Sequence, residues 1–393
     1  MPRANLLGLV LFLGGSAGYA AAEDASLPIS ALTILDTHFQ TQETKAQGAP
    51  LASELFNDSD LSTSLAWSDW LQLNGDLRLE RQHNDQLDDY YPSGNAFLRS
   101  EGLTAQQLYA SVESDDWRFY GGKLETGFAS GYRSNYGAQQ GIFYGFGWDY
   151  DQSERIALGI ERKLPQWMGD ARISVETFFL DTSFLSNSLF SRPSLADESA
   201  ERPRQFRLDQ YFPSDTGNFN SYTIALKGSA IPDLDGLKYQ VSYTREATHV
   251  PTWNPERGES AGVAYDPTGS GVPLAAWLGV VPRLEFTHFD NEWGVPGLER
   301  NYALAGAAFV DDRWSVDLNF GLRQTHDPAN SSNYPFTNAI ALQENNAWDV
   351  QENATLAYEV IDNLRLAVGF NHIRIDGRPS NSVAQSLDYR ILF

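Results

Sequence analysis

The chain has 393 residues, and its 51 Asp and Glu outnumber its 28 Lys and Arg, so the formal net charge is -23. Such a charge repels phosphate backbones and excludes a nucleic-acid-binding protein. Cysteine is absent, which excludes a disulfide framework. The 32 Gly, 22 Phe, 18 Tyr and 10 Trp, against two Met, favour strands and turns over helices.

The first 22 residues have the pattern of a secretory signal peptide. Met1–Arg3 gives a short positive start, Leu6–Phe12 is apolar, and Ala20–Ala22 supplies small residues before Glu23. This pattern predicts cleavage after Ala22, and the apolar stretch is too short to span a membrane. No later segment has the ~20 consecutive apolar residues of a transmembrane helix, so we expect an exported chain without a helical anchor.

Residues 23–69 form an acidic segment that contains Lys45 as its single basic residue. If the strands that follow close into a barrel, we expect this segment to lie in the periplasm or to plug the lumen of that barrel. The alternative is that Leu32–Phe39 adds a first strand.

From Trp70 to Phe393 the dominant signal is the alternation of apolar and polar residues. Val316, Leu318 and Phe320 share one face of such a run, opposite Asp317 and Asn319. A period of two residues indicates strands that are apolar on one face only. Short turns are predicted near 114–116, 165–170, 232–236, 311–312 and 361–363, and longer connections near 83–102, 127–154, 183–219, 248–300 and 326–346, with a sixth, short one near 377–381.

These runs predict a closed antiparallel transmembrane β-barrel of about 12 strands over residues 70–393, with short turns at one end and long loops at the other. A strand at Arg283–Asn291 would raise the number to about 14. An even number of strands places both chain ends at the periplasmic end. Aromatic residues near strand ends suit the two membrane interfaces: Trp70, Trp117, Trp314, Trp348, Tyr389 and Phe393.

The last eight residues, Ser386–Phe393, alternate in polarity and finish on an aromatic ring. This segment resembles the C-terminal β-signal that the barrel-assembly machinery reads, and we expect it to close the barrel against the strand that starts near Trp70. With the signal peptide and the strand–turn pattern, the chain resembles the Gram-negative outer-membrane β-barrel porins. That resemblance implies an outer-membrane location, contact with outer-membrane lipid and lipopolysaccharide, and passive diffusion of small hydrophilic solutes without a cofactor. It implies no particular oligomeric state.

The face opposite the lipid carries acids and bases in nearly equal number. Charges inside a barrel must be paired or hydrated, so the lumen is either a hydrated pore or an ion-paired plug. Balanced charges with acidic outer loops favour at most a mild preference for cations. The candidate pore-lining residues are Asp76, Arg78, Lys123, Glu125, Arg133, Arg155, Glu161, Arg172, Glu176, Lys227, Asp317, Arg323 and Arg390.

The segment Gly127–Trp148 is rich in glycine and aromatic residues. We expect it to fold back into the mouth of the barrel as a constriction, with Arg133 as its charge and with rings that stack on solutes. The alternative is an outer loop that packs on its own rings.

Catalytic patterns are weak. Gly258–Gly262 matches the G-x-S-x-G pattern of a nucleophile elbow, but it lies between Pro255 and Pro267 in an expected outer loop, and that chemistry requires a strand-to-helix turn. Two His–Asp pairs near the outer rim, at His288 and His326, leave an outer-membrane hydrolase as one alternative. A closed barrel with partner-binding loops is another. The six histidines lack the spacing of metal ligands, and we expect no catalytic or metal site.

Overall fold

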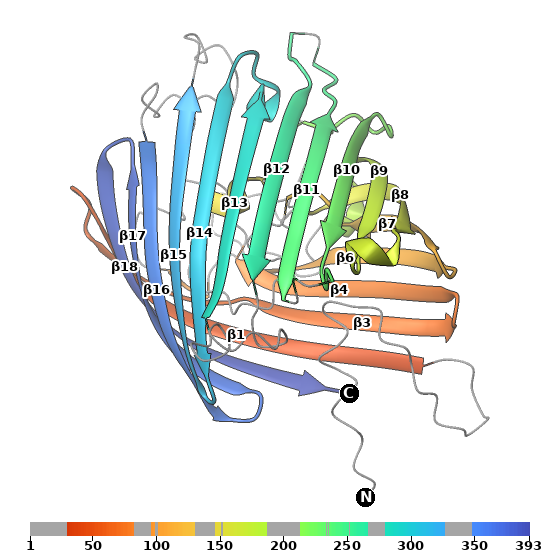
Figure 1. Ribbon diagram of the computed structural model, residues 1–393. Coiled ribbons are helices and arrows are strands. Elements are labelled where there is room, and N and C mark those ends of the chain that lie inside the picture. Colours follow the sequence, from red (N-terminus) through yellow and green to blue (C-terminus); the bar gives the residue numbers. More distant parts are fainter. Residues whose placement is uncertain are drawn as a thin grey trace, which may run out of the picture.

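The computed structural model describes residues 30–81, 96–98, 101–129, 146–150, 152–186, 213–232, 234, 236–250, 252–265, 280–326 and 348–393. These residues form one closed antiparallel β-barrel (Figure 1). Its strands are β1 (Ser30–Ala46), β2 (Leu51–Asn57), β3 (Ser59–Ser68), β4 (Leu71–Arg81), β5 (Ala96–Phe97), β6 (Glu101–Glu113), β7 (Trp117–Leu124), β8 (Arg155–Lys163), β9 (Arg172–Leu180), β10 (Ser221–Gly228), β11 (Leu237–Glu246), β12 (Glu256–Tyr265), β13 (Val280–Asp290), β14 (Glu299–Asp311), β15 (Trp314–His326), β16 (Trp348–Ile361), β17 (Leu364–Ile375) and β18 (Arg378–Leu392). Short 3-10 turns lie between them, at η2 (Phe146–Tyr150), η3 (Gln166–Met168), η4 (Phe184–Ser186) and η6 (Glu292–Gly294).

The wall has 16 strands. One edge of β1 pairs with β2 and then with β3, which continue one another across Asp58 and act as a single strand of the wall. The two-residue β5 pairs in parallel with β2 and adds no strand to the circuit. The all-β closed barrel is therefore confirmed, whereas both predicted strand numbers, 12 and 14, are too low.

The strands that the sequence pattern failed to predict have little contrast between their two faces. In β12 the inward positions include Gly258, Ser260 and Gly262, and the outward positions include Arg257 and Glu259. Because neither face is consistently apolar, the period-two signal is lost. The segment 248–300, expected as one outer loop, instead contains β12, β13 and the start of β14, and the alternative strand at Arg283–Asn291 is confirmed as β13.

The acidic N-terminal segment is also corrected by the structure. Residues 30–68, expected in the periplasm or as a plug, form β1 and the combined β2–β3 strand, and the alternative first strand at Leu32–Phe39 is confirmed as part of β1. The last strand, β18, closes the barrel on β1, from Ile34 opposite Leu392 to Ala46 opposite Ser380, and not on the strand that starts near Trp70. The predicted signal peptide, residues 1–22, lies outside the described residues.

The two ends of the barrel differ in their connections. The start of β1 and the end of β18 lie at one end, as the even strand number requires, and Figure 1 shows the two together. We call this the terminal end and the opposite one the loop end. Turns at the terminal end are short, and Asp312 and Asn363 adopt the positive φ values, 47° and 71°, that tight hairpins need. The β7–β8 connection, residues 125–154, which we call the inserted connection, and the connection 181–220 both belong to the loop end.

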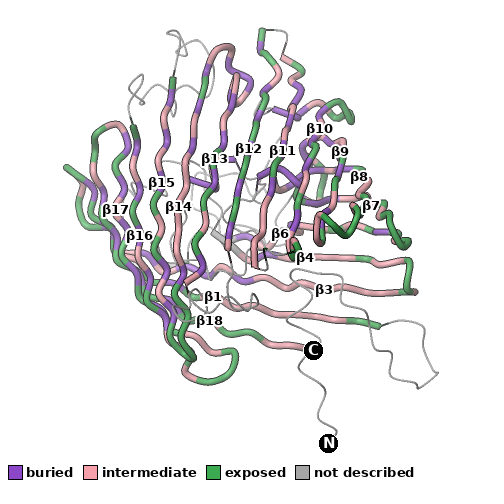
Figure 2. Tube along the Cα trace, viewed as in Figure 1, coloured by how far each residue is buried: buried purple, intermediate pink, exposed green. Residues whose placement is uncertain are grey.

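Burial alternates along the strands (Figure 2). Outward apolar residues such as Leu318, Phe320 and Val368 are exposed, as a lipid-facing band requires. The aromatic residues at strand ends are exposed as well, as a membrane-interface girdle needs: Trp70, Trp117, Trp314, Trp348, Tyr389 and Phe393. Among the described residues, no helix is long and apolar enough to cross a membrane.

Polar side chains join β1 and β18 on the inside of the closure. His38 Nδ1 contacts Asp388, which also lies 3.6 Å from Arg365 on β17. Arg390 Nε donates to Asp36 Oδ1 at 2.6 Å, and Thr44 Oγ1 lies 2.9 Å from Ser382 Oγ. These contacts supplement the backbone pairing where the two ends of the chain meet.

We therefore expect Asp388→Ala to lower the stability of the folded barrel by about 1–2 kcal/mol, because His38 and Arg365 lose their carboxylate. The measurement is the temperature at which the folded band disappears in SDS gel electrophoresis. Asp311→Ala, at an exposed position at the end of β14, is the control and should leave this temperature unchanged. Equal temperatures for the two variants would contradict a contribution of this contact to closure.

Candidate functional site

The connection between β7 and β8 enters the barrel. The backbone N–H of Gly127 donates to Glu176 Oε2 at 2.6 Å, and that of Ala129 donates to Ser242 Oγ at 2.8 Å. The side-chain amide of Gln240 donates to the carbonyl of Gly127 at 2.8 Å. Since Glu176, Gln240 and Ser242 lie on the buried, lumen-facing sides of β9 and β11, residues 127–129 lie against the inner wall there.

The other described part of this inserted connection, η2, contacts a different part of the wall. The backbone N–H of Phe146 donates to Gln351 Oε1 on β16 at 3.1 Å. Arg323 on β15 donates to Asp149 at 2.7 Å and to Asp349 at 2.8 Å, and its guanidinium lies 4.8 Å from the centre of the Phe146 ring. One buried arginine thus joins the inserted connection to two strands. The described ends of the connection therefore contact β9 and β11 on one side and β15 and β16 on the other.

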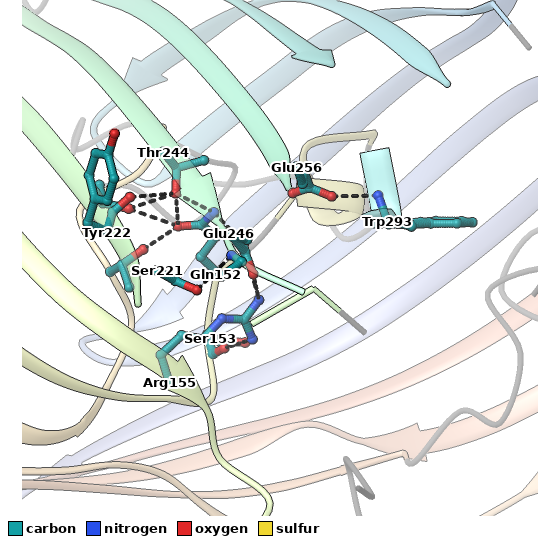
Figure 3. A network of polar contacts seen from close by, with 12 residues as sticks. Gln152, Ser153, Arg155, Ser221, Tyr222, Thr244, Glu246, Glu256 and Trp293 are labelled. Atoms are coloured by element: carbon teal, nitrogen blue, oxygen red, sulfur yellow. Dashed lines mark hydrogen bonds and ion pairs between the residues drawn. The ribbon is translucent and has the colours of Figure 1, made fainter. Parts of the chain in front are cut away.

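A third set of contacts holds the return of the chain to β8 (Figure 3). The side-chain amide of Gln152 donates to Thr244 Oγ1 at 3.1 Å and to Glu246 Oε1 at 2.6 Å. Arg155 Nη2 lies 3.3 Å from Glu246 Oε2. Arg155 and Glu246, two buried charges of this network, are thereby paired, as burial inside a protein favours.

Aromatic side chains of the inserted connection are buried against the wall. Phe128, Phe146 and Tyr150 are 4%, 0% and 5% exposed. The Tyr150 hydroxyl donates to Glu285 on β13, and its ring centre lies 4.9 Å from that of Tyr302 on β14. Burial leaves these three rings no surface on which a solute could stack. They anchor the described ends of the connection to the inner wall, and the predicted stacking role does not fit them. Residues 130–145 of the predicted constriction lie outside the described residues.

Two inward glycines of the wall make room for those rings. A Cβ on Gly258 would lie 2.7 Å from Phe128 Cζ and 2.6 Å from Phe289 Cε1. A Cβ on Gly321 would lie 3.1 Å from Phe146 Cδ2. Gly258 belongs to the G-x-S-x-G pattern, so that pattern has a packing role here.

A second connection packs inside the loop end through η6. Glu292, fully buried, lies 2.9 Å from Arg300 Nε and accepts a 2.8 Å hydrogen bond from Tyr302. Burial raises the pKa of the Glu292 carboxyl, and the charge of Arg300 and the bond from Tyr302 oppose that rise. The Trp293 N–H donates to Glu256 Oε2 at 2.6 Å, as Figure 3 shows.

Most of the predicted pore-lining residues face the lumen, and most of these are paired. Arg155, Glu176 and Arg323 hold the inserted connection, as described above. Other predicted residues pair along the wall: Arg172 with Glu161 at 2.9 Å, Asp317 with Arg283 at 3.2 Å, Arg390 with Asp36, and Arg78 with Asp60 and with Asp58 at 3.9 Å. Asp76 lies on β4 and Lys227 on β10. Glu125 is exposed at the start of the inserted connection, and Arg133 lies outside the described residues.

Lys123 departs from this pattern. It stands opposite Leu108 and Ile156 in the sheet, so it projects from the lipid-side face, where it is fully buried. Its Nζ contacts Glu154, lies 3.0 Å from Asp181, and donates to the carbonyl of Leu185 at 3.1 Å. Lys123 is therefore no pore-lining residue; it binds the start of the 181–220 connection to the barrel.

Ser260 and His288, two residues of the hydrolase alternative, do not converge, whereas His326 of the second His–Asp pair ends β15 and its Asp327 lies outside the described residues. Ser260 lies in β12 and not in an outer loop; it faces inward, and its Oγ accepts a 3.0 Å hydrogen bond from Thr287. His288 projects from the opposite face of the sheet, 2.8 Å from Asn301 Oδ1 and 3.3 Å from Asp290. A nucleophile needs its base within hydrogen-bond reach, which opposite faces forbid. Within the described part of the chain, no group of three or more His, Asp or Glu side chains is placed to hold a metal.

No family model and no curated protein matches this sequence. Solved structures do match. They include OprB of Pseudomonas putida (13% identity, TM-score 0.59, covering 92% of this chain and 94% of that one), the anion-selective porin of Comamonas acidovorans (12%, 0.53, 92% and 99%) and OmpF of Salmonella typhi (9%, 0.53, 92% and 97%). At such identities the likeness concerns the fold. The chain has the 16-stranded closed barrel fold of the outer-membrane porins.

Proposed function

We propose that this protein is a passive channel for small hydrophilic solutes in the outer membrane of a Gram-negative bacterium. The observation that carries the proposal is the β7–β8 connection bound inside a closed 16-stranded wall by residues of β9, β11, β15 and β16. Barrels of about eight strands are filled by side chains, whereas about 16 strands leave an aqueous lumen. A lumen of this size needs an internal element to restrict what passes.

The chemistry of the lumen supports hydrophilic cargo. Inward positions carry ion pairs, amides and hydroxyls, and β18 presents small side chains inward at Ser380, Ser382, Ala384 and Ser386. The matched Comamonas protein is described as an anion-selective porin. Residues 1–22 then act as the export signal, and outer-membrane lipid, lipopolysaccharide and the barrel-assembly machinery are the proposed partners.

The decisive experiment is conductance in planar lipid bilayers with the purified protein. A channel gives discrete, reproducible current steps. Neutral sugars of increasing size, tested by swelling of proteoliposomes, then give the exclusion limit. A folded, inserted barrel that is silent in both assays would refute the channel.

Arg323→Gln should loosen the constriction, because Asp149, Asp349 and the Phe146 ring lose their shared cation. Breaking such a buried ion network costs about 3–5 kcal/mol. We expect larger and more variable single-channel conductance together with a lower unfolding temperature. Arg313→Gln, in an exposed turn where Nη1 donates to the carbonyl of Val360, is the control. Unchanged conductance in folded Arg323→Gln channels would show that this arginine does not hold the constriction.

Gly258→Ala tests the packing of Phe128. The added Cβ would overlap Phe128 and Phe289, and overpacking of this kind costs about 1–3 kcal/mol. We expect a displaced inserted connection, seen as altered conductance and as faster proteolysis of that connection. Gly75→Ala is the matched control, because its Cβ would meet only Leu108 Cδ1, at 3.9 Å. If the two variants behave alike, the packing of Phe128 against Gly258 does not hold the inserted connection in place.

A further inference from the structure

Four basic residues gather on the inner wall at the terminal end of β8–β11. Lys163 on β8 stands directly opposite Arg172 on β9, and Arg172 stands directly opposite Lys227 on β10. Lys227 is opposite Gln240, and Lys238 lies two residues further along the same face of β11. We call Lys163, Arg172, Lys227 and Lys238 the basic cluster.

Register and burial both place this cluster in the lumen. Arg155, Ala157 and Glu161 on β8 and Thr223 and Ala225 on β10 occupy the inward face, and steps of two residues bring Lys163 and Lys227 to the same face. The cluster itself is accessible: Lys163 and Lys227 are exposed, and Arg172 and Lys238 are partly exposed.

The cluster has an excess of positive charge. Arg172 pairs with Glu161 at 2.9 Å, and Glu161 also faces Arg118 across the sheet. Among the described residues, Lys163, Lys227 and Lys238 have no ion pair. Glu176 is a further carboxylate near the cluster. It interacts electrostatically with Lys227, and its oxygens accept hydrogen bonds from the Tyr120 hydroxyl at 2.5 Å and from the Gly127 N–H at 2.6 Å.

Other basic residues toward the terminal end are neutralised. Arg283 lies 3.2 Å from Asp317, Arg365 lies 3.6 Å from Asp388, and Arg390 lies 2.6 Å from Asp36. Like charges directly opposite one another in a sheet are destabilising. A row of Lys, Arg and Lys is therefore unfavourable in an empty lumen, in a chain whose net charge is -23.

We propose that the basic cluster is a binding site for small oxyanions, carboxylates or phosphates, at the terminal end of the lumen. An oxyanion there can accept hydrogen bonds from several ammonium groups at once and remove their mutual repulsion. The site rests on the proposed channel function, since it gives that channel a class of solute. It also lowers the preference for cations that the acidic outer loops confer.

The test compares wild type with the triple variant Lys163→Gln, Lys227→Gln, Lys238→Gln. Reversal potentials under a KCl gradient should show the anion-to-cation permeability ratio falling about tenfold, because three charges act on each passing ion. Block of the current by citrate or inorganic phosphate should weaken by a similar factor. The corresponding triple Lys→Arg variant should behave as wild type. Lys45→Gln, which removes a lysine on the outer face of β1, should change neither quantity.

A second measurement does not depend on conduction. Equilibrium dialysis of the detergent-solubilised barrel against citrate and inorganic phosphate should show binding to wild type and to the Lys→Arg variant, and its loss in the Lys→Gln variant. If wild type is silent in bilayers yet binds these anions, the channel fails and the site stands. Conduction with equal selectivity, block and binding in wild type and the Lys→Gln variant would overturn the site and leave the channel intact.

Discussion

The backbone pairing of β1 with β18 is the constraint on which the rest of this molecule depends. In the hydrocarbon of a bilayer, each unpaired N–H or C=O costs several kcal/mol, so a sheet must close on itself. The circuit closes only because Ser30–Ala46 is a strand, although its acidic and amide residues make it a poor one by pattern. Closure then determines the rest: an even strand number, both chain ends at one end of the barrel, and a lumen that must accept every side chain not facing lipid.

The sequence predicted the parts of this barrel in which the two faces differ chemically. The hairpins turning at 311–312 and 361–363, the common end of the two termini and the inward Asp388 and Arg390 could all be derived from a period of two residues. The main predictions failed at β1, β2–β3 and β12, and only the alternative strand at Leu32–Phe39 coincides with part of β1. There the lipid-side positions include Thr41, Glu43 and Glu259, and the inward ones include Gln40 and Gly258. Pairing of neighbouring strands, and not local amphipathicity, decides that these segments are strands.

The polarity of the barrel wall is locally reversed at Lys123, which explains the wrong prediction there. At the loop end of β7–β9, Leu124, Ala157 and Phe178 form an apolar cluster on the lumen side. Lys123, Glu154 and Asp181 occupy the lipid side but are sealed from solvent. A rule that assigns charged residues to the lumen therefore places Lys123 on the wrong face of its strand. The ion pair of Arg323 with Asp149 could not be predicted from the sequence either, because Asp149 belongs to the inserted connection and not to a strand of the wall.

In this lumen, the residues that hold the inserted connection differ from most of the residues proposed to bind anions. Ordering a backbone costs about 1–2 kcal/mol per residue. Full burial of a side chain as large as Phe128 or Phe146 returns about 1.5–3 kcal/mol, and the paired charges around Arg155, Glu246 and Arg323 keep the segment in register. Charges used in this way are neutralised by their neighbours and exert little field on a passing ion. In the basic cluster of β8–β11, Arg172 pairs with Glu161 and Lys227 interacts electrostatically with Glu176. Lys163, Lys227 and Lys238 have no ion pair among the described residues, so their field remains available to solutes. The paired residues therefore set the position of the constriction, and the lysines of the basic cluster set the preference for a sign of charge. The two are coupled at Glu176, which interacts with Lys227 and accepts the hydrogen bond from Gly127.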